Sequence, residues 1–209
     1  HFIYNGIEIT VKDPLPDTIN IKKVINHIAS IVPEKLISGV KGINVGRFSV
    51  LQRRKIQAVW MNNNIYVTNE QESESDILDD IVHEIAHSVE DRFSKLIYSD
   101  KTIEKEFLAK RKLLWNQLTR HGYEKNLSIV LDPKYNKRFD EFLYNDVGYP
   151  LLSVMTRNIF NSPYAATSLR EYFANGFEAY FLKEDTHRLK RLCPNLFNKM
   201  GELVDVENY

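Results

Sequence analysis

Cysteine is almost missing from this chain of 209 residues, in which Cys193 is the only one. A disulfide needs two cysteines, so the class of small secreted domains held together by internal disulfides is excluded. The chain also lacks a run of 18 apolar residues, the length that a membrane-spanning helix requires. It opens without the charged and then apolar segments of a signal peptide. We therefore expect a soluble chain without a membrane span, and its compartment, cytoplasmic or secreted, is left open.

An excess of charge of either sign is missing as well. The 28 Lys and Arg residues balance the 28 Asp and Glu residues, so composition predicts neither a nucleic acid nor an anionic membrane as partner. Apolar residues make up 43% and charged residues 27% of the chain, which is ordinary for a globular protein. The length suits a single domain over residues 1–209 with a substantial core, and the oligomeric state is left open.

One segment carries a chemical motif: residues 83–87 read His-Glu-Ile-Ala-His. Ile77, Ile81, Ile85 and Val89 recur every four residues around it, which predicts an amphipathic helix over about residues 74–94. Side chains four residues apart on a helix lie one above the other, so both histidines can reach one metal ion.

The residue between the histidines has a different role. Glu84 is rotated by about 100° from His83 around the helix, so its carboxylate can lie beside a metal-bound water and act as a general base. This is the arrangement of a zinc hydrolase. The alternative without a function is that the motif occurs by chance on an exposed helix face. An apolar stripe on the opposite side argues against that alternative, because a buried helix leaves two histidines in need of a ligand.

The segments before this helix predict a small mixed sheet. We expect a strand or hairpin over residues 2–11, a helix over 21–31, a strand over 42–50, and two strands, 56–60 and 64–68, joined as a hairpin. This order matches the N-terminal half of a zincin, in which the edge strand beside the active-site helix takes up an extended peptide. Residues 57–60 are the candidate edge, and an interior strand is the alternative.

Helices dominate the predicted second half. An amphipathic helix is expected over 102–120, two short helices between 124 and 150, and a further helix over about 167–181, which is rich in aromatic residues. The predicted fold class is therefore α+β and zincin-like: a small mixed sheet, the helix of the His-Glu motif, and a mostly helical C-terminal half.

A catalytic zinc site needs a third protein ligand. A metzincin would have Gly at 90 and His at 93, where this chain has Glu90 and Phe93, and His121 and His187 lie in weakly patterned or basic surroundings. A glutamate on a later helix is favoured, and Glu171 is the first candidate. Three alternatives stay open at this point: Glu178 or Glu141 could be the ligand, or Glu171 could serve only in a capping box with Ser168.

Three segments together resemble a known family. Residues 83–90 (His-Glu-Ile-Ala-His-Ser-Val-Glu), 171–177 (Glu-Tyr-Phe-Ala-Asn-Gly-Phe) and the tail 181–194 are similar to the catalytic domain of the anthrax lethal factor peptidases. They are especially similar to the small relatives of these peptidases, the clostridial Pro-Pro endopeptidases. The resemblance implies that His83, His87 and Glu171 bind one Zn²⁺ per chain. It also implies that Tyr164, seven residues before Glu171, assists catalysis.

The chain departs from the family pattern in three places. His87 and Glu171 are 84 positions apart, more than in the family, so we interpret residues 100–160 as a helical insertion. Asn175 replaces the second glutamate of the family's second motif, and Glu90 stands where the family usually has aspartate. Asn175 is one helical turn after Glu171, so we expect its amide oxygen to accept a hydrogen bond from a zinc histidine. The alternative is that Asn175 and Gly176 only relax the helix where another segment approaches.

The predicted function is that of a zinc endopeptidase acting on a protein or peptide substrate. Glu84 would accept a proton from the zinc-bound water, and Tyr164 would donate to the oxyanion. The alternative is a binding or regulatory protein that keeps the zincin fold but has little peptidase activity.

Overall fold

The strands of the described chain all lie in its first 94 residues. The computed structural model describes residues 1–206, and these divide into one unit formed by residues 1–94 and a second formed by residues 95–206. The first unit contains a five-stranded sheet with helices, and the second is helical, which confirms the α+β class. No helix within residues 1–206 has the length and apolar character needed to cross a membrane. The single-domain expectation stays a prediction.

The sheet is mixed, as predicted, and its strand order is β1-β2-β3-β5-β4. Antiparallel pairs lie at both ends, β1 with β2 and β4 with β5, and β3 runs parallel to β2 and β5. The strands are β1 (Phe2–Tyr4), β2 (Ile7–Val11), β3 (Gly42–Val45), β4 (Ala58–Met61) and β5 (Asn64–Val67). The predicted β4–β5 hairpin is therefore confirmed, and residues 2–11 form a hairpin, one of the two alternatives predicted for them. Asn62 and Asn63 turn the second hairpin with positive φ angles of 54° and 60°, which asparagine tolerates better than most residues.

Strand β4 forms one edge of the sheet, as predicted for residues 57–60. The N–H of Thr68 donates to the carbonyl of Gln57 at 2.8 Å, and ladder bonds of an antiparallel pair recur at every second residue. The register pairs Trp60 with Ile65, a pair that falls between these bonds. The main-chain N–H of Trp60 therefore points away from β5, towards the open side of the edge.

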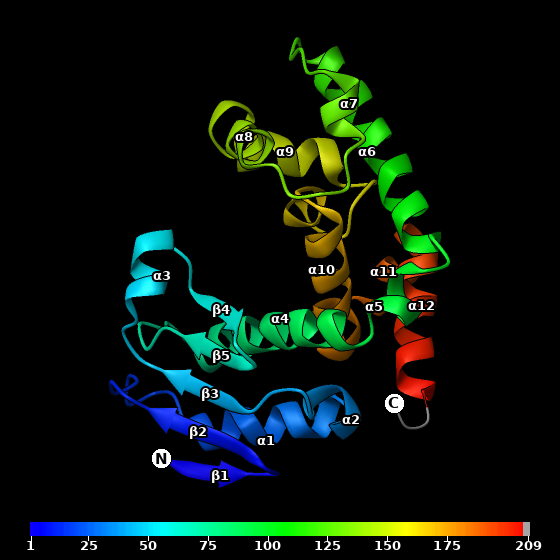
Figure 1. Cartoon of the computed structure of the whole chain (residues 1–209). Helices are drawn as coiled ribbons and strands as arrows, with labels where there is room; N and C mark the ends of the chain where they lie inside the picture. The colour runs from blue at the N-terminus through cyan, green and yellow to red at the C-terminus, as the bar shows by residue number, and fades with distance from the viewer. Residues whose placement is uncertain (207–209) are drawn as a thin grey trace. The chain divides into compact units, whose positions relative to one another are not determined.

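The long helix α4 (Glu74–Arg92) carries the His-Glu motif and packs against the sheet. It contacts β4, β5, α1 (Ile21–Ile31) and α2 (Glu34–Ile37), and Figure 1 shows it beside the β4–β5 hairpin. The predicted stripe of four apolar residues is fully buried: Ile77, Ile81, Ile85 and Val89. Burial of this stripe gives α4 a defined rotation, so the motif side chains have a defined direction.

One predicted strand is too long. The strand expected over 42–50 ends at Val45, and Ser49–Arg54 form helix α3. Leu, Gln and Arg favour helix, and Leu51 is buried while its neighbours on the outer side are exposed. Lys55 then ends the helix with a left-handed backbone, φ 53°. The strand-like pattern of the sequence therefore ends before Gly46, and the residues after Gly46 belong to the next helix.

The second unit is built from helices around α10 (Leu169–Phe181), which contacts α6, α11, α12 and the short 3₁₀ turn η2. Within this unit, the ring centroids of Phe107, Phe160 and Tyr172 lie 5.4–6.2 Å apart. The predicted helix over 102–120 is confirmed as α6, and short helices do occur between 124 and 150. The elements are α5 (Ser94–Tyr98), α6 (Thr102–Arg120), α7 (Leu127–Val130), α8 (Lys137–Glu141), the π-helical turn η1 (Phe142–Val147), α9 (Tyr149–Thr156), η2 (Pro163–Ala166), α10, α11 (Thr186–Leu192) and α12 (Pro194–Asp205).

Residues 100–160, the predicted insertion, contain α6 to α9 and belong to the same unit as α10.

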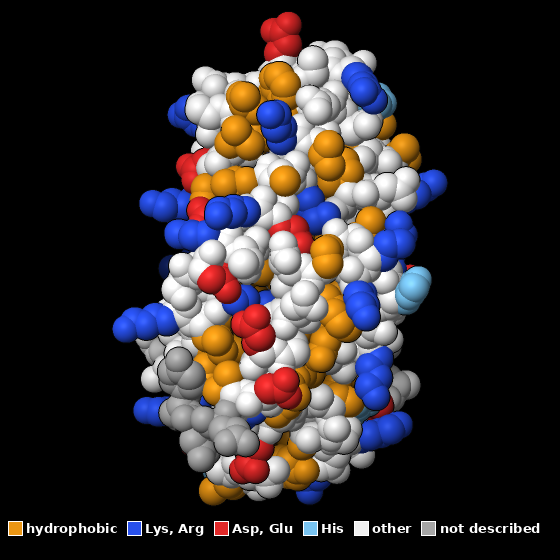
Figure 2. Space-filling view, turned by 90° about the vertical axis from the view of Figure 1, so that its right-hand side faces the viewer, with side chains coloured by type: hydrophobic (Ala, Val, Ile, Leu, Met, Phe, Trp, Pro, Cys, Tyr) orange, Lys and Arg blue, Asp and Glu red, His pale blue; other side chains and the backbone are white. Residues whose placement is uncertain are grey.

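On the face that Figure 2 shows, acidic and basic side chains both lie among apolar ones. Neither sign of charge covers that face, in keeping with the zero net charge of the sequence.

Candidate metal centre and catalytic residues

The start of α4 is set by a side-chain cap. Ser73 has an extended backbone, and its hydroxyl accepts the main-chain N–H of Asp76 at 3.1 Å. Glu74 and Asp76 place negative charge in the first turn, where the helix dipole favours it. The helix continues for 19 residues without interruption, so the spacing of the motif side chains is that of a regular helix.

The two histidines of the motif are placed so that both could bind one metal ion. Their Nε2 atoms are 3.2 Å apart, and their rings are nearly perpendicular, at 84°. Two nitrogens bound tetrahedrally to zinc at about 2.0–2.1 Å would be about 3.3 Å apart. The spacing of His83 and His87 therefore fits a tetrahedral ion with little movement of either ring.

Glu84 is buried, with 7% of its surface exposed, and its carboxylate is held by the sheet. Oε2 accepts the main-chain N–H of Trp60 at 2.7 Å, a short and charge-assisted bond. Sequence reasoning placed residues 57–60 at the edge but did not assign a role to Trp60. The predicted edge position could have indicated this contact. Every second N–H of an edge strand points away from the neighbouring strand and can bond to an adjacent helix.

The acidic residues around the motif have partners within the first unit. Asp80 Oδ2 accepts from the side-chain amide of Gln71 at 3.0 Å. Burial raises the pKa of Asp80, while the Gln71 bond and the nearby His83 lower it in part. Asp91 Oδ2 accepts the indole N–H of Trp60 at 2.6 Å.

Glu171 lies in the first turn of α10, and its main chain takes part in the cap. The Ser168 hydroxyl accepts the N–H of Glu171 at 3.1 Å. This half of the predicted capping box uses the main chain of Glu171 rather than its carboxylate. Capping and metal binding are therefore compatible in this residue.

A buried arginine holds the segment that leads into α10. Arg111, with 1% of its surface exposed, donates to the carbonyls of Val130 and Thr167 at 3.0 Å each. Burial lowers the pKa of Arg111 to about 10, which leaves it cationic at neutral pH. Thr167 directly precedes the capping Ser168, so Arg111 fixes the start of the helix that carries Glu171.

A second buried link holds the other side of the same helix. The hydroxyl of Tyr172, next to Glu171, donates to Glu106 Oε1 at 2.6 Å. The Glu106 carboxylate also accepts the N–H groups of Asn195 and Leu196 at the start of α12. These bonds join α6, α10 and α12 around the first turn of α10.

Tyr164 lies in η2, in the same unit as Glu171, with 46% of its surface exposed. Partial burial and the charge of Glu171 raise the pKa of its hydroxyl above the ordinary value. An ordinary tyrosine is already protonated at neutral pH, and this shift leaves the hydroxyl a hydrogen-bond donor. This is the property that the predicted role of Tyr164 requires.

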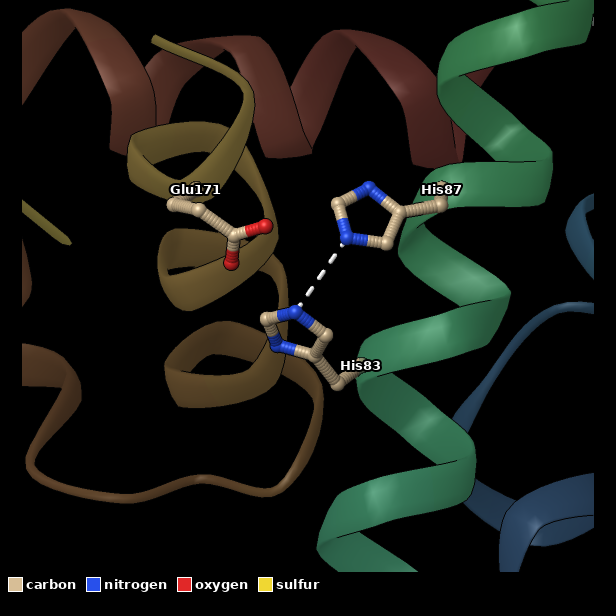
Figure 3. A group of neighbouring side chains, drawn as sticks. All are labelled: His83, His87 and Glu171. Carbon is tan, nitrogen blue, oxygen red and sulfur yellow. Dashed lines mark hydrogen bonds between the residues drawn. The ribbon is translucent and has the colours of Figure 1, made fainter. Parts of the chain in front are cut away.

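His83, His87 and Glu171 form a group that could hold a metal ion (Figure 3). Each offers one ligand atom, and these atoms all lie within 4.8 Å of one another. No other such group of three occurs within residues 1–206, so neither Glu178 nor Glu141 belongs to one. His121 and His187 are exposed, in agreement with the prediction that they are not ligands.

Asn175 does not make the bond that was predicted for it. Its Oδ1 atom is buried, yet no group in the described chain donates a hydrogen bond to it. The neighbouring Gly176 instead lies against Leu196 of α12. The alternative, close approach of another segment at Gly176, therefore describes this turn better.

Comparison with protein-family models, curated proteins and solved structures finds no match to this chain. The chemistry of the site is therefore the basis for its interpretation.

Proposed function

We propose that this protein is a zinc-dependent endopeptidase with a zincin-like fold, which hydrolyses peptide bonds in protein or peptide substrates. The observation that carries the proposal is the group of His83, His87 and Glu171, with Glu84 between the two histidines on α4. Two imidazoles and one carboxylate are a common ligand set of catalytic zinc. The family resemblance of the motifs points to the same activity.

The donor set fits zinc and argues against the hard cations Ca²⁺ and Mg²⁺. Imidazole nitrogens suit Zn²⁺, whereas Ca²⁺ and Mg²⁺ prefer shells made entirely of oxygen. The 3.2 Å separation of the histidine nitrogens allows both to bind one zinc ion. Zinc held there would polarise a peptide carbonyl and lower the pKa of a coordinated water to about 7.

The residues of the chain would then move the protons. Glu84 would accept a proton from the attacking water as the new C–O bond forms, and deliver it to the amine nitrogen as the C–N bond breaks. Tyr164, whose hydroxyl is protonated at neutral pH as in any ordinary tyrosine, would donate a hydrogen bond to the carbonyl oxygen as negative charge develops on it.

The open edge of β4 is the proposed docking site for the substrate main chain. An extended peptide can add to a sheet edge as one more strand, held by main-chain hydrogen bonds. Because the outward N–H of Trp60 donates to Glu84, the peptide would use the other outward main-chain groups of β4. Strand β4 is the edge that contacts α4, so a peptide bound there would lie near the motif.

A binding or regulatory protein with little peptidase activity is the second candidate. It is favoured by large apolar side chains that are exposed on the second unit: Leu113, Ile129, Tyr135, Tyr144 and Val154. A contiguous patch of such side chains would mark a surface that binds another protein, whereas singly scattered ones are ordinary.

One experiment separates the two candidates. The purified protein is incubated with a diverse peptide library, with and without a zinc chelator, beside the Glu84→Gln variant. If the protein is a peptidase, cleavage should be lost with the chelator, restored by added zinc, and absent from the Glu84→Gln variant. An absence of cleavage in the zinc-loaded wild type would favour the binding protein.

A further inference from the structure

We propose that Trp60 is a positioning residue: it fastens the edge strand β4 to α4 and thereby holds the Glu84 carboxylate in its working orientation. The proposal rests on the proposed peptidase function and adds a residue that the motifs do not contain.

The first contact is made by the main chain. The Trp60 N–H donates to Glu84 Oε2 at 2.7 Å. This N–H lies on the open side of β4, because the neighbouring ladder bonds to β5 are made by the residues before and after it. The orientation of the Glu84 carboxylate therefore depends on where the edge strand lies.

The second contact is made by the side chain of the same residue. The Trp60 indole N–H donates to Asp91 Oδ2 at 2.6 Å. Glu84 and Asp91 are seven residues apart on α4, which is about two helical turns and places them on the same side of the helix. Trp60 therefore bonds to α4 at two positions about two turns apart, through its main-chain N–H at Glu84 and its indole N–H at Asp91.

A four-residue edge strand needs such a fastening. Strand β4 has a neighbouring strand on only one side, and edge elements of this kind open more easily than interior ones. The indole bond restrains the position of Trp60 along α4, and the amide of the same residue then meets Glu84. Loss of the indole bond would loosen the amide contact without touching Glu84 or the histidines.

The test compares two tryptophan substitutions of the same kind. Trp60→Phe keeps the ring and the main-chain N–H but removes the indole donor. Trp115→Phe is the matched control, because the indole of Trp115 also donates to one acceptor, the Lys125 carbonyl at 3.1 Å. We expect Trp60→Phe to lower kcat about 10-fold, the effect of one hydrogen bond to a charged group, with KM changed less than about 2-fold and zinc content unchanged. Trp115→Phe should leave kcat as it is.

Variants of Asp91 test the same link from the helix side. Asp91→Ala should lower kcat as Trp60→Phe does, and Asp91→Asn should restore much of it, because the amide oxygen can still accept the indole N–H. In the double variant Trp60→Phe/Asp91→Ala the loss should equal that of either single variant. Additive losses, or a kcat for Trp60→Phe equal to that of Trp115→Phe, would overturn the proposal.

A fluorescence measurement keeps this proposal separate from the proposed function. In the Trp115→Phe background Trp60 is the only tryptophan, since the chain has two. Asp91→Ala should then change the emission of Trp60 while Asp91→Asn changes it less, and unchanged emission in Asp91→Ala would refute the link. A wild type that cleaves no peptide would refute the peptidase function, whatever the emission shows.

Discussion

Gly176 of α10 lies directly beneath the side chain of Leu196 of α12, so closely that a methyl group at Gly176 would come within 2.6 Å of Leu196 Cγ. Helices α10 and α12 therefore pack at a distance that only glycine permits here. Since α10 carries Glu171, this contact helps to define where that proposed ligand lies within the second unit.

We predict that Gly176→Ala destabilises the protein by about 1–3 kcal/mol, the range for forcing an extra methyl group into a packed interior. Gly201→Ala is the matched control, because Gly201 is also inside a helix, α12, but has open space where a Cβ would lie. It should stabilise by about 0.5–1 kcal/mol through the better helix propensity of alanine. Urea denaturation of both variants checks the pair. Equal changes in the two would mean that the contact with Leu196 does not constrain the helices.

The ligand assignment predicts a division between the three metal residues and Glu84. Alanine at His83, His87 or Glu171 should cause loss of zinc on dialysis, because three protein ligands become two. Glu84→Gln should retain zinc and lose turnover, because Glu84 is assigned to proton transfer. Atomic absorption after dialysis gives the metal content. Full zinc retention in Glu171→Ala would return Glu178 and Glu141 to consideration, and zinc loss in Glu84→Gln would remove its role as a general base.

Tyr164→Phe should lower kcat with little change in KM. A hydroxyl that donates to the developing oxyanion acts mainly in the transition state. The loss of one such donor costs on the order of 2.7–4 kcal/mol of transition-state stabilisation, so kcat should fall by about 10²–10³-fold. Steady-state kinetics at saturating zinc check this prediction. An unchanged kcat would limit Tyr164 to packing within η2.

Stability at acidic pH should depend on Asp100 and Lys199. Lys199 has 2% of its surface exposed, and its ammonium donates to Asp100 Oδ2 at 2.7 Å. This bond, with the N–H of Thr102, lowers the pKa of Asp100 from 3.8 to about 2. Because the pKa is depressed in the folded state, the stabilisation is fully present above pH 3.8 and is lost as the pH falls through about 2.

We therefore expect the melting temperature of the wild type to fall more steeply between pH 4 and pH 2 than that of Asp100→Asn. Lys199→Met, which removes the partner, should show the same shallower slope as Asp100→Asn. Thermal melts of the three proteins at several pH values make the comparison. Parallel slopes would show that this ion pair does not contribute to acid unfolding.

Several features of the protein could be predicted from short stretches of sequence. The apolar period of α4 set its length and buried side, and the spacing of His83 and His87 placed both rings on one side of the helix. The two Asn residues at 62 and 63 turned the β4–β5 hairpin. These features are local, because contacts between residues two to four apart depend on backbone geometry that the residue types largely determine.

Tertiary structure decided the rest. The sequence favoured Glu171 as the third ligand but left Glu178 and Glu141 open, and the structure groups Glu171, and neither of the other two, with both histidines. The contact of Trp60 with Glu84 and the missing partner of Asn175 Oδ1 depend in the same way on neighbours far away in the chain. Side-chain identity limits which groups can bond, but contacts between distant segments form only when the helices and strands that carry them pack, and that packing is set by the whole core.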